Sequence, residues 1–562
     1  MSTVIFLVLR RLRTPLLLIS FVYTIATFGL TVIPGVDDQG NAWQMDFFHA
    51  FYFVTFMGTT IGFGELPYPF TDGQRLWALI SIYITVATWI YTIGAILHLI
   101  RDETLRRAIT EYQFRNAVTR LREPFYLICG YGDTGSKLVD SLARRQILAT
   151  VIEIKQERIA SLILGDQPLF IPRLCADAGD PENLILGGIQ HPMCAGIVAL
   201  TDQDSINLHI AITAKVLNPD VKVICRADSH EIKANMKSFG TDYVVDPFDT
   251  FAESLSTALH SPNQYLLREW LRGESGEPLT ELTPVASGKW VLCGYGRFGL
   301  PIYDQLIEAG IEVQVIEPYP EARNAPEGTV TGWGTEAVTL EEANIRDAVG
   351  IVAGTNDDSN NLSIIVTAME LNPELFTVVR HSEHYNRVLF ENSHADIIMA
   401  PGAVVAKKIR TLLTNPLVDH FLSLTRAHDD DWAAGVIDTL RRVSRNRIPE
   451  LWEVSVTEDH ADAVYNAVTG GQQITISQLI IDHTDRERSI SAVALVHENE
   501  SGSFSMPIGD SVLNAGDRLL FAGTRGSRSN MEWTLQNHVA LEYVTTGEVQ
   551  PQSYIGKWLF SN

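Results

Sequence analysis

Two long apolar segments and one shorter aromatic segment dominate the first hundred residues of the chain. The uncharged segments cover residues 15–34 and 76–100, and about twenty such residues suffice for a helix to cross the hydrocarbon core of a bilayer. Between them, residues 46–65 form an aromatic, amphipathic run that ends in glycines. The pattern predicts a membrane domain over residues 1–107, in which a short helix and a re-entrant loop lie between two spans.

Beyond this domain, short apolar runs alternate with amphipathic helical runs, after a polar helical linker over residues 108–122. Such alternation predicts parallel α/β sheets with helices on both faces. Residues 1–107 contain seven basic and seven acidic residues, so the formal net charge of −24 arises entirely in residues 108–562. An acidic soluble part argues against nucleic acid as a partner, because a phosphate backbone requires a basic face.

Basic residues flank the two predicted spans on the same side. Arg10, Arg11 and Arg13 precede the first span, and Arg101, Arg106 and Arg107 follow the second. By the positive-inside rule both termini are expected in the cytoplasm, with the connecting loop outside. We therefore expect a multi-pass protein of the plasma (inner) membrane, in contact with lipid, whose acidic outer loop attracts cations.

The aromatic run ends in a short segment with glycines at alternate positions. Glycine adopts backbone conformations that aim neighbouring carbonyl groups to one side, and rings of carbonyl oxygens replace the water shell of K⁺ in selectivity filters. An ordinary turn is the alternative interpretation. The segment resembles the signature of potassium-channel filters, with Ile and Phe in place of Val and Tyr, and Glu65 follows it. The expected filter residues are Thr60, Ile61, Gly62, Phe63 and Gly64.

Two spans cannot enclose a pore alone, and the filter resemblance implies four copies around one axis. The second span would then line the inner pore. Gly94 is a candidate hinge, although it lies nearer the cytoplasmic end than is usual in such channels. Leu97 and Ile100 are candidate gate residues, because an apolar constriction blocks ions by dewetting. Packing against lipid or a neighbouring helix is the alternative for both.

A glycine fingerprint occurs twice in the soluble part. Each copy has an apolar run, a GxGxxG loop, a helical run and a second apolar run that ends in glutamate. This order is typical of dinucleotide-binding folds, in which the glycines admit a pyrophosphate at a helix N-terminus and the acid binds ribose. The second copy repeats the first at an offset of 164 residues, and later segments repeat at 154. The recurrence predicts two copies of one unit.

The two glycine loops differ in charge, since Asp133 of the first corresponds to Arg297 of the second. A guanidinium pairs with phosphate and a carboxylate repels it, although Asp133 is compatible with a cation or a sugar hydroxyl. Arg226 and Arg380 are equivalent residues that either reach phosphates or form ion pairs. An empty, degenerate copy is the alternative at each site. The expected nucleotide-site residues are Gly130, Gly132, Asp133, Thr134, Gly135, Glu153 and Asp177 in the first copy, and Gly294, Gly296, Arg297, Phe298, Gly299 and Glu317 in the second.

This arrangement resembles the prokaryotic two-transmembrane potassium channels with tandem regulator-of-K⁺-conductance (RCK) domains. The resemblance covers nearly the whole chain and implies a homotetramer with eight RCK domains in a cytosolic ring. It implies a two-span pore domain, two Rossmann-like RCK domains and a small C-terminal α+β lobe. The expected boundaries are the first RCK domain at 123–260, a crossover at 261–289, the second RCK domain at 290–404, a helical crossover at 405–450 and the C-terminal lobe at 451–562.

The resemblance also implies the ligands: K⁺ in the filter, NAD or an adenosine nucleotide in the RCK domains, and Ca²⁺ or another divalent ion. No EF-hand spacing occurs in the sequence, and solvated turns or helix caps are the alternative for each acidic cluster. The five cysteines form no CxxC pair and are expected to be reduced. The metal ligands stay open, with candidates at Asp202, Asp204, Asp357, Asp358 and residues 428–431.

These observations predict a ligand-gated, potassium-selective channel that is not an enzyme. A membrane-anchored NAD-dependent oxidoreductase would explain the glycine loops but leaves the segment between the spans without a role. A nucleotide-binding regulatory subunit of a potassium transporter is a third hypothesis, although such a subunit needs no filter. The sequence does not determine whether a ligand opens or closes the pore.

Overall fold

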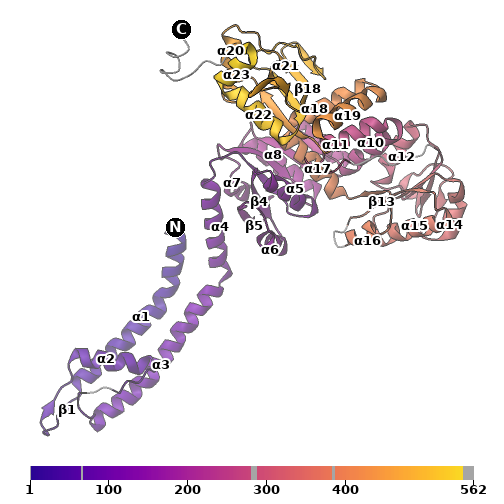
Figure 1. Cartoon of the computed structure of the whole chain (residues 1–562). Helices are drawn as coiled ribbons and strands as arrows, with labels where there is room; N and C mark the ends of the chain where they lie inside the picture. Colours follow the sequence, from indigo (N-terminus) through magenta and orange to yellow (C-terminus); the bar gives the residue numbers. More distant parts are fainter. Residues whose placement is uncertain (1, 65–66, 280–287, 383–385, 548–562) are drawn as a thin grey trace, which may run out of the picture. The chain divides into compact units, whose positions relative to one another are not determined.

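The computed structural model describes residues 2–64, 67–279, 288–382 and 386–547 (Figure 1). The chain divides into two compact units. The first comprises residues 1–121 together with 186–188, and the second comprises residues 122–185 and 189–562.

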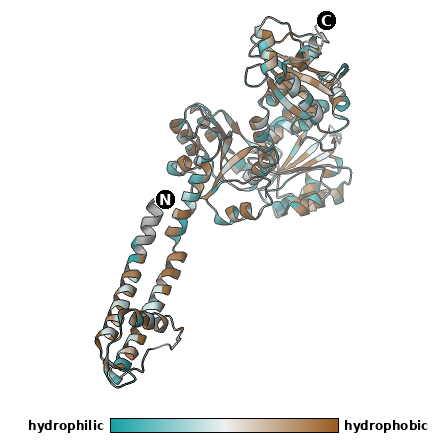
Figure 2. Cartoon of the chain, turned by 60° about the vertical axis from the view of Figure 1, so that its left-hand side comes forward, coloured by the Kyte–Doolittle hydropathy of each residue, from teal (hydrophilic) through white to brown (hydrophobic). Residues whose placement is uncertain are grey.

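The first unit is mainly helical. It contains α1 (Ser2–Val32), β1 (Gly35–Val36), β2 (Ala42–Trp43), α2 (Phe47–Gly58), α3 (Asp72–Arg101) and α4 (Glu103–Thr119). Leu12–Val32 and Asp72–Arg101 are long and apolar enough to cross a membrane, and only 28% and 22% of their apolar windows are buried inside the chain. Figure 2 shows hydrophobic residues along the length of both helices. This exposed apolar surface requires lipid or further protein to cover it.

Helix α1 begins earlier than the predicted span. The uncharged run starts at Pro15, whereas the helix starts at Ser2 and continues through this proline. Proline removes one backbone hydrogen bond, and membrane helices tolerate that loss. The basic residue Arg13 consequently lies on the same continuous helix as the apolar segment.

Helices α1 and α3 pack closely through aromatic and small residues. The Trp77 indole donates to the Ala26 carbonyl at 3.0 Å, and the Trp89 indole donates to the Tyr23 hydroxyl at 2.6 Å. A Cβ at Gly29 would overlap the Trp77 ring, so only glycine fits there. Small and polar residues form the buried stripe of α3, as is typical of membrane helix interfaces. The stripe comprises Gln74, Ala78, Ser81, Thr85, Thr88 and Thr92, with Leu99 near its end.

Two parallel six-stranded sheets organise the second unit, with strand orders β5-β4-β3-β6-β7-β8 and β11-β10-β9-β12-β13-β14. Both orders are that of the doubly wound dinucleotide-binding fold, so the prediction of two tandem Rossmann-like domains is confirmed. The first sheet contains β3 (Phe125–Cys129), β4 (Leu148–Glu153), β5 (Arg173–Cys175), β6 (Cys194–Ala199), β7 (Lys222–Arg226) and β8 (Tyr243–Val245). The second contains β9 (Trp290–Cys293), β10 (Val313–Glu317), β11 (Val330–Thr331), β12 (Gly350–Ala353), β13 (Phe376–Arg380) and β14 (Ile397–Met399).

Helices connect the strands in both domains. The first domain has α5 (Asp133–Arg144), α6 (Gln156–Leu164), α7 (Pro181–Leu186), α8 (Asp204–Leu217) and α9 (His230–Ser238). The second has α12 (Gly299–Glu308), α13 (Pro320–Arg323), α14 (Ala337–Glu342), the 3₁₀ turn η1 (Ile345–Asp347), α15 (Asp358–Leu371) and α16 (Arg387–Glu391).

The two domains exchange the helices that follow their last strands. Helix α10 (Pro247–His260) follows β8, yet Phe248 and Phe251 belong to the core of the second domain with Trp290. Helix α17 (Pro401–Thr414) follows β14, yet Val405 and Ile409 belong to the core of the first domain. Each sheet is therefore covered by a helix from the other half of the repeat, which joins the two domains through their cores.

The exchanged helices continue into a helical layer and a C-terminal lobe. The layer contains α11 (Pro262–Leu271), α18 (Pro416–Leu424), the 3₁₀ turn η3 (Thr425–Ala427) and α19 (Asp430–Ser444). Since α11 and α18 both begin at a proline and follow equivalent helices, the internal repeat extends to this pair. A four-stranded antiparallel sheet of order β15-β20-β18-β19 forms the lobe. Its elements are β15 (Glu450–Ser455), α20 (Asp462–Thr469), α21 (Ile476–Leu479), β16 (Ile481–Asp482), β17 (Asp485–Ser489), β18 (Ala492–Asn499), β19 (Gly502–Ser505), β20 (Arg518–Gly523), α22 (Arg525–Gln536) and α23 (His538–Thr546). The predicted α+β lobe is confirmed.

Candidate functional sites

In the segment that follows α2, the backbone angle φ is positive at every second residue. Thr60, Gly62 and Gly64 have φ values of 61°, 66° and 70°. Left-handed residues at alternate positions turn successive peptide groups toward one side, which is the arrangement that a ring of coordinating carbonyls requires. Ile61 and Phe63 expose 61% and 70% of their surface within the single chain. Glu65 lies outside the described residues.

Helix α2 holds this segment in place. The Asp46 carboxylate caps its start by accepting from the His49 backbone N–H at 2.8 Å. At its end, the N–H groups of Ile61 and Gly62 both donate to the Phe56 carbonyl, at 3.0 and 3.3 Å. The segment thus begins at the C-terminal end of α2, where the helix dipole is negative and favours a cation.

Helix α3 runs without a break through Gly94, and no atom outside the immediate backbone lies within 4 Å of a Cβ built there. Its continuity ends instead at Asp102, whose extended backbone terminates α3 and whose side chain caps α4 by accepting from the Leu105 N–H at 3.1 Å. Leu97 and Ile100 expose 54% and 62% of their surface within the chain. In this structure the break between α3 and α4 therefore lies at Asp102 and not at Gly94, and the sequence did not indicate it.

The first glycine loop closes tightly onto its own helix. Gly130 has φ of 103°, and a Cβ at Gly135 would overlap the Gly130 carbonyl, so the loop requires glycine at both positions. The Glu153 carboxylate is 3% exposed and accepts from the N–H groups of Tyr131 and Lys155 at 2.6 and 2.9 Å. Glu153, which is predicted to bind a ribose, therefore stabilises the loop in this structure. Its carboxylate keeps acceptor capacity for a further donor.

A guanidinium that the sequence did not indicate lies over the first loop. Arg158 of α6 contacts Glu153 at 3.5 Å and Asp202 at 3.4 Å, and one of its nitrogens would lie 3.2 Å from a Cβ at Gly132. The negative charge of Asp133 is balanced by Lys137 at 2.7 Å. The cation beside the first loop therefore comes from helix α6 and not from the loop itself.

The second loop repeats the glycine geometry. Gly294 has φ of 95°, and a Cβ at Gly299 would overlap the Gly294 carbonyl. The Glu317 carboxylate, 5% exposed, accepts from the Tyr295 N–H at 2.7 Å. Arg297 belongs to the loop itself, and its side chain is 60% exposed and lies 3.7 Å from the Asp228 carboxylate. The two loops have the same backbone geometry. They differ in the position of the nearby arginine, which lies on helix α6 in the first domain and in the loop in the second.

The side chains of two further predicted residues, Phe298 and Thr134, are buried. Phe298 is 1% exposed, because its ring packs at 5.9 Å from that of Phe248 on the exchanged helix α10. Only its backbone is available to a nucleotide, and its side-chain assignment is corrected to core. Thr134 is likewise buried. Asp177 accepts from the Gly179 N–H at 2.8 Å and forms a turn after β5.

The candidate metal-binding carboxylates cap helices and turns. Asp204 accepts from the Asp228 and Ser229 N–H groups, and Asp358 accepts from the Ser382 N–H at 2.8 Å. The remaining candidates include Asp202, which contacts Arg158, and the helix caps Asp357 and Asp429. Among the described residues, no group of three His, Cys, Asp or Glu side chains has metal-binding geometry.

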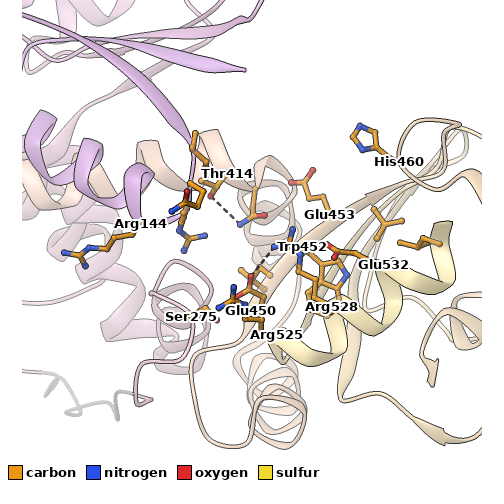
Figure 3. A pocket seen from close by; sticks show the side chains of 18 of the residues that line it. Arg144, Ser275, Thr414, Glu450, Trp452, Glu453, His460, Arg525, Arg528 and Glu532 are labelled. Atoms are coloured by element: carbon orange, nitrogen blue, oxygen red, sulfur yellow. Dashed lines mark hydrogen bonds and ion pairs between the residues drawn. The ribbon is translucent and has the colours of Figure 1, made fainter. Parts of the chain in front are cut away.

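A cavity of about 1090 Å³ lies between the first Rossmann-like domain and the C-terminal lobe, and no predicted site residue lines it. Figure 3 shows Arg144 on the domain side, with Arg528 and Glu532 on the lobe side. Arg528 is paired with Glu450 at 3.2 Å and Glu532 at 2.8 Å. The cavity borders the C-terminal end of α5, whereas the glycine loop precedes its N-terminal end. It is therefore separate from the glycine loop, and its wall contains charged side chains that pair with one another.

Two protein-family models match the chain. The ion channel family matches residues 17–102, and the TrkA-N domain matches twice, over residues 126–247 and 290–401. The chain belongs to the TrkA-N domain family, and its N-terminal part matches the ion channel family. These matches coincide with the helical unit around α2 and with the two glycine-loop sheets.

Relatives of this family include channel and transport proteins. Potassium channel protein 1 of Methanocaldococcus jannaschii is 25% identical over 204 residues, which are 36% of this chain and 59% of that protein. The Trk system potassium uptake protein TrkA homolog of Methanothermobacter thermautotrophicus is 32% identical over 183 residues, 31% of this chain and 82% of that protein. The chain covers less than two-thirds of the length of its channel relatives, at 59% and 58% of the two from M. jannaschii. The solved structure "GsuK channel bound to NAD" is 15% identical, with coverage of 95% of this chain and 99% of that one and a TM-score of 0.47.

Proposed function

We propose that the chain forms a potassium-selective pore whose opening is controlled by nucleotides bound at the two glycine loops. The observation that carries the proposal is the alternating sign of φ at Thr60, Gly62 and Gly64, directly after a short apolar helix. Such a backbone directs Thr60–Gly64 carbonyls to one side, where four copies would surround a dehydrated K⁺. The family membership of the chain supports this assignment.

The proposed assembly is a homotetramer in the plasma membrane, with both termini in the cytoplasm. The exposed apolar surfaces of α1 and α3 support it, because a single chain buries less than a third of either apolar window. Leu97 and Ile100 are the proposed inner gate. Eight Rossmann-like domains would form the cytosolic ring, and its movement would reach α3 through α4, with Gly94 or the cap at Asp102 as the bending point.

The proposed ligand at each loop is NAD or an adenosine nucleotide. Each glycine turn allows close approach of a pyrophosphate to a helix N-terminus, and a guanidinium lies beside each turn, that of Arg158 in the first domain and that of Arg297 in the second. Glu153 and Glu317 would accept hydrogen bonds from the ribose hydroxyl groups of the ligand. The proposed role of the ligand is to shift a closed–open equilibrium, with no chemical turnover. Ca²⁺ as an additional ligand stays a proposal without a defined site.

Ion flux into liposomes that contain the purified full-length protein tests this function. We expect K⁺ uptake to exceed Na⁺ uptake, and ADP or NAD to change the rate of K⁺ uptake. Equal uptake of both ions would refute selectivity. Reduction or oxidation of nicotinamide without K⁺ uptake would favour a membrane-anchored oxidoreductase, and nucleotide binding without any flux would favour a regulatory subunit of a transporter.

A further inference from the structure

A cavity of about 280 Å³ lies where the two exchanged helices meet. Helix α10 contacts both α17 and α11 (Figure 1), and residues of these three helices line the cavity together with β14 and Arg272, which follows α11. Pockets for drug-sized ligands measure about 300–1,000 Å³, so this cavity suits a small occupant. Among the described residues, none from either glycine loop lines it.

Three cationic side chains line the cavity against one carboxylate. The cations are Lys407, Lys408 and Arg272, and the carboxylate is Glu269. Glu269 is already occupied, because its Oε2 lies 2.6 Å from the Lys407 ammonium group. Arg272 donates to Asp419, outside the lining, at 2.6 Å. The lining therefore has more positive charge than its own carboxylate balances.

Lys408 is the cation of the lining that lacks a partner. With the described residues its ammonium group forms neither a hydrogen bond nor an ion pair, and burial and, next, the like charge of Arg272 lower its pKa. Ser254 and Lys408 are each the eighth residue of their helices, which begin at Pro247 and Pro401. The internal repeat thus places two equivalent positions at one cavity, and one of them carries a charge.

Two arginines beside Lys408 also have unused capacity for an acceptor. The Nε of Arg272 is buried and has no hydrogen-bond partner among the described residues. Arg268, four residues earlier on α11, is 8% exposed. Burial and, next, the charge of Arg272 lower the pKa of Arg268 to about 10. Buried donors and cations without partners are costly, and an anion in the cavity would reduce this cost.

The carboxylates that act most strongly on Lys408 and Arg268 are each paired with another cation. The pairs are Glu253–Arg426 at 3.5 Å, Glu269–Lys407 at 2.6 Å and Asp419–Arg272 at 2.6 Å. In the part of the chain that the structure describes, Lys408 and Arg268 stay outside these ion pairs. The group consequently has two positive charges more than its carboxylates, which matches the charge of a divalent anion.

We propose that this cavity binds a small divalent oxyanion of the class of inorganic phosphate. The anion contacts Lys408 and Arg272, the Tyr265 hydroxyl in the lining is a neutral donor, and Arg268 adds positive charge without contact. Lys408 belongs to the second half of the repeat, whereas Arg272 and Tyr265 belong to the first. The bound anion therefore links the two exchanged halves. This site is independent of the proposed nucleotide binding.

Thermal unfolding of the full-length protein in detergent tests the inference, with inorganic phosphate compared with chloride at equal ionic strength. A ligand that binds the native state raises the unfolding temperature in a saturable manner. We expect this rise in the unchanged protein and its loss in Lys408→Met. Phosphate also stabilises proteins through exclusion from their surface, but that effect acts equally on both proteins.

Calorimetric titration with inorganic phosphate measures the same site directly. Lys408→Met should weaken saturable phosphate binding about tenfold, because one charge-assisted contact is lost. The affinity for ADP should stay unchanged, since the cavity is too small for a nucleotide. A parallel loss of ADP affinity would contradict a separate site for a free anion.

Lys215→Met is the matched control, because Lys215 is also partly buried, at 21% exposed, but lies on α8 and pairs with Asp242. It should keep the full phosphate-dependent rise. An equal rise in Lys408→Met and in the unchanged protein would overturn the inference, as would the absence of any saturable phosphate effect in the unchanged protein. If Lys408→Met fails to assemble, Ser254→Asp decides. Its carboxylate takes the place of the anion, so a phosphate effect that persists in full contradicts the site.

Discussion

Replacement of Gly64 by alanine tests the filter at the level of a single backbone angle. The residue has φ of 70°, and a Cβ there would lie 4.0 Å from the Gly62 carbonyl oxygen, an ordinary contact. The cost of alanine is therefore conformational and not steric, about 1–2 kcal/mol per chain for a left-handed residue with a Cβ. In the proposed tetramer the four copies sum to about 4–8 kcal/mol for a fully formed carbonyl ring.

At the lower end of this range, about 4 kcal/mol reduces the population of the intact ring roughly a thousandfold. We expect Gly64→Ala to abolish K⁺ uptake into liposomes while the protein still elutes as an assembled oligomer. Gly40→Ala is the matched control, because Gly40 also has a positive φ, 81°, with open space around its Cβ position, but lies in the β1–β2 turn. It should lower stability by a similar amount and leave K⁺ uptake intact. Normal K⁺ uptake by assembled Gly64→Ala protein would refute the filter assignment.

Two further changes address the soluble unit. Arg158→Gln should weaken nucleotide binding at the first loop roughly tenfold, as measured by calorimetry, because a charge-assisted hydrogen bond is lost. Arg144→Gln, at the far end of α5, is the control and should have no effect. An equal loss of affinity in both variants would contradict the role of Arg158. Burial and, next, Asp249 raise the pKa of Asp246 to about 6, so the native state holds an extra proton below that pH and loses the associated stability as the pH rises through 6. Asp246→Asn should therefore raise the thermal unfolding temperature, measured by scanning fluorimetry, more at pH 7.5 than at pH 5. The difference corresponds to about 1 kcal/mol in the free energy of unfolding. Equal shifts at both pH values would contradict this reasoning.

The sheets and glycine loops were predictable because the sequence repeats them. The fingerprint around Gly130 recurs around Gly294, and local rules fix what such a loop does: positive φ at the first glycine and contact with the helix at the third. The alternating backbone of Thr60–Gly64 was predictable for a different reason, since glycines at alternate positions encode a local backbone property. Features set by one short segment can be inferred without knowledge of the rest of the fold.

Features set by long-range packing were not predictable. The apolar face of α10 indicates that the helix is buried, but the same pattern would allow it to pack on either sheet. Tertiary packing decides that α10 and α17 are exchanged between the two domains. Phe298 was included among the nucleotide-site residues of the second glycine loop, but its side chain lies in the core because α10 brings Phe248 against it. Arg158 was missed since its distance from the loop in sequence conceals its position above Gly132.

In the proposed gating, the cations beside the two glycine loops would have different consequences. Arg158 binds within one domain, whereas Arg297 is linked through Asp228 to the neighbouring domain, so the second site is the better placed to transmit occupancy. A ligand that favours one ring state tenfold contributes about 1.4 kcal/mol per site. A switch from 1:99 to 99:1 requires about 5.5 kcal/mol, and four such sites, one per chain of a tetramer, supply about 5.6 kcal/mol. The second sites alone are therefore sufficient to drive the proposed transition, provided that all four act on one concerted equilibrium.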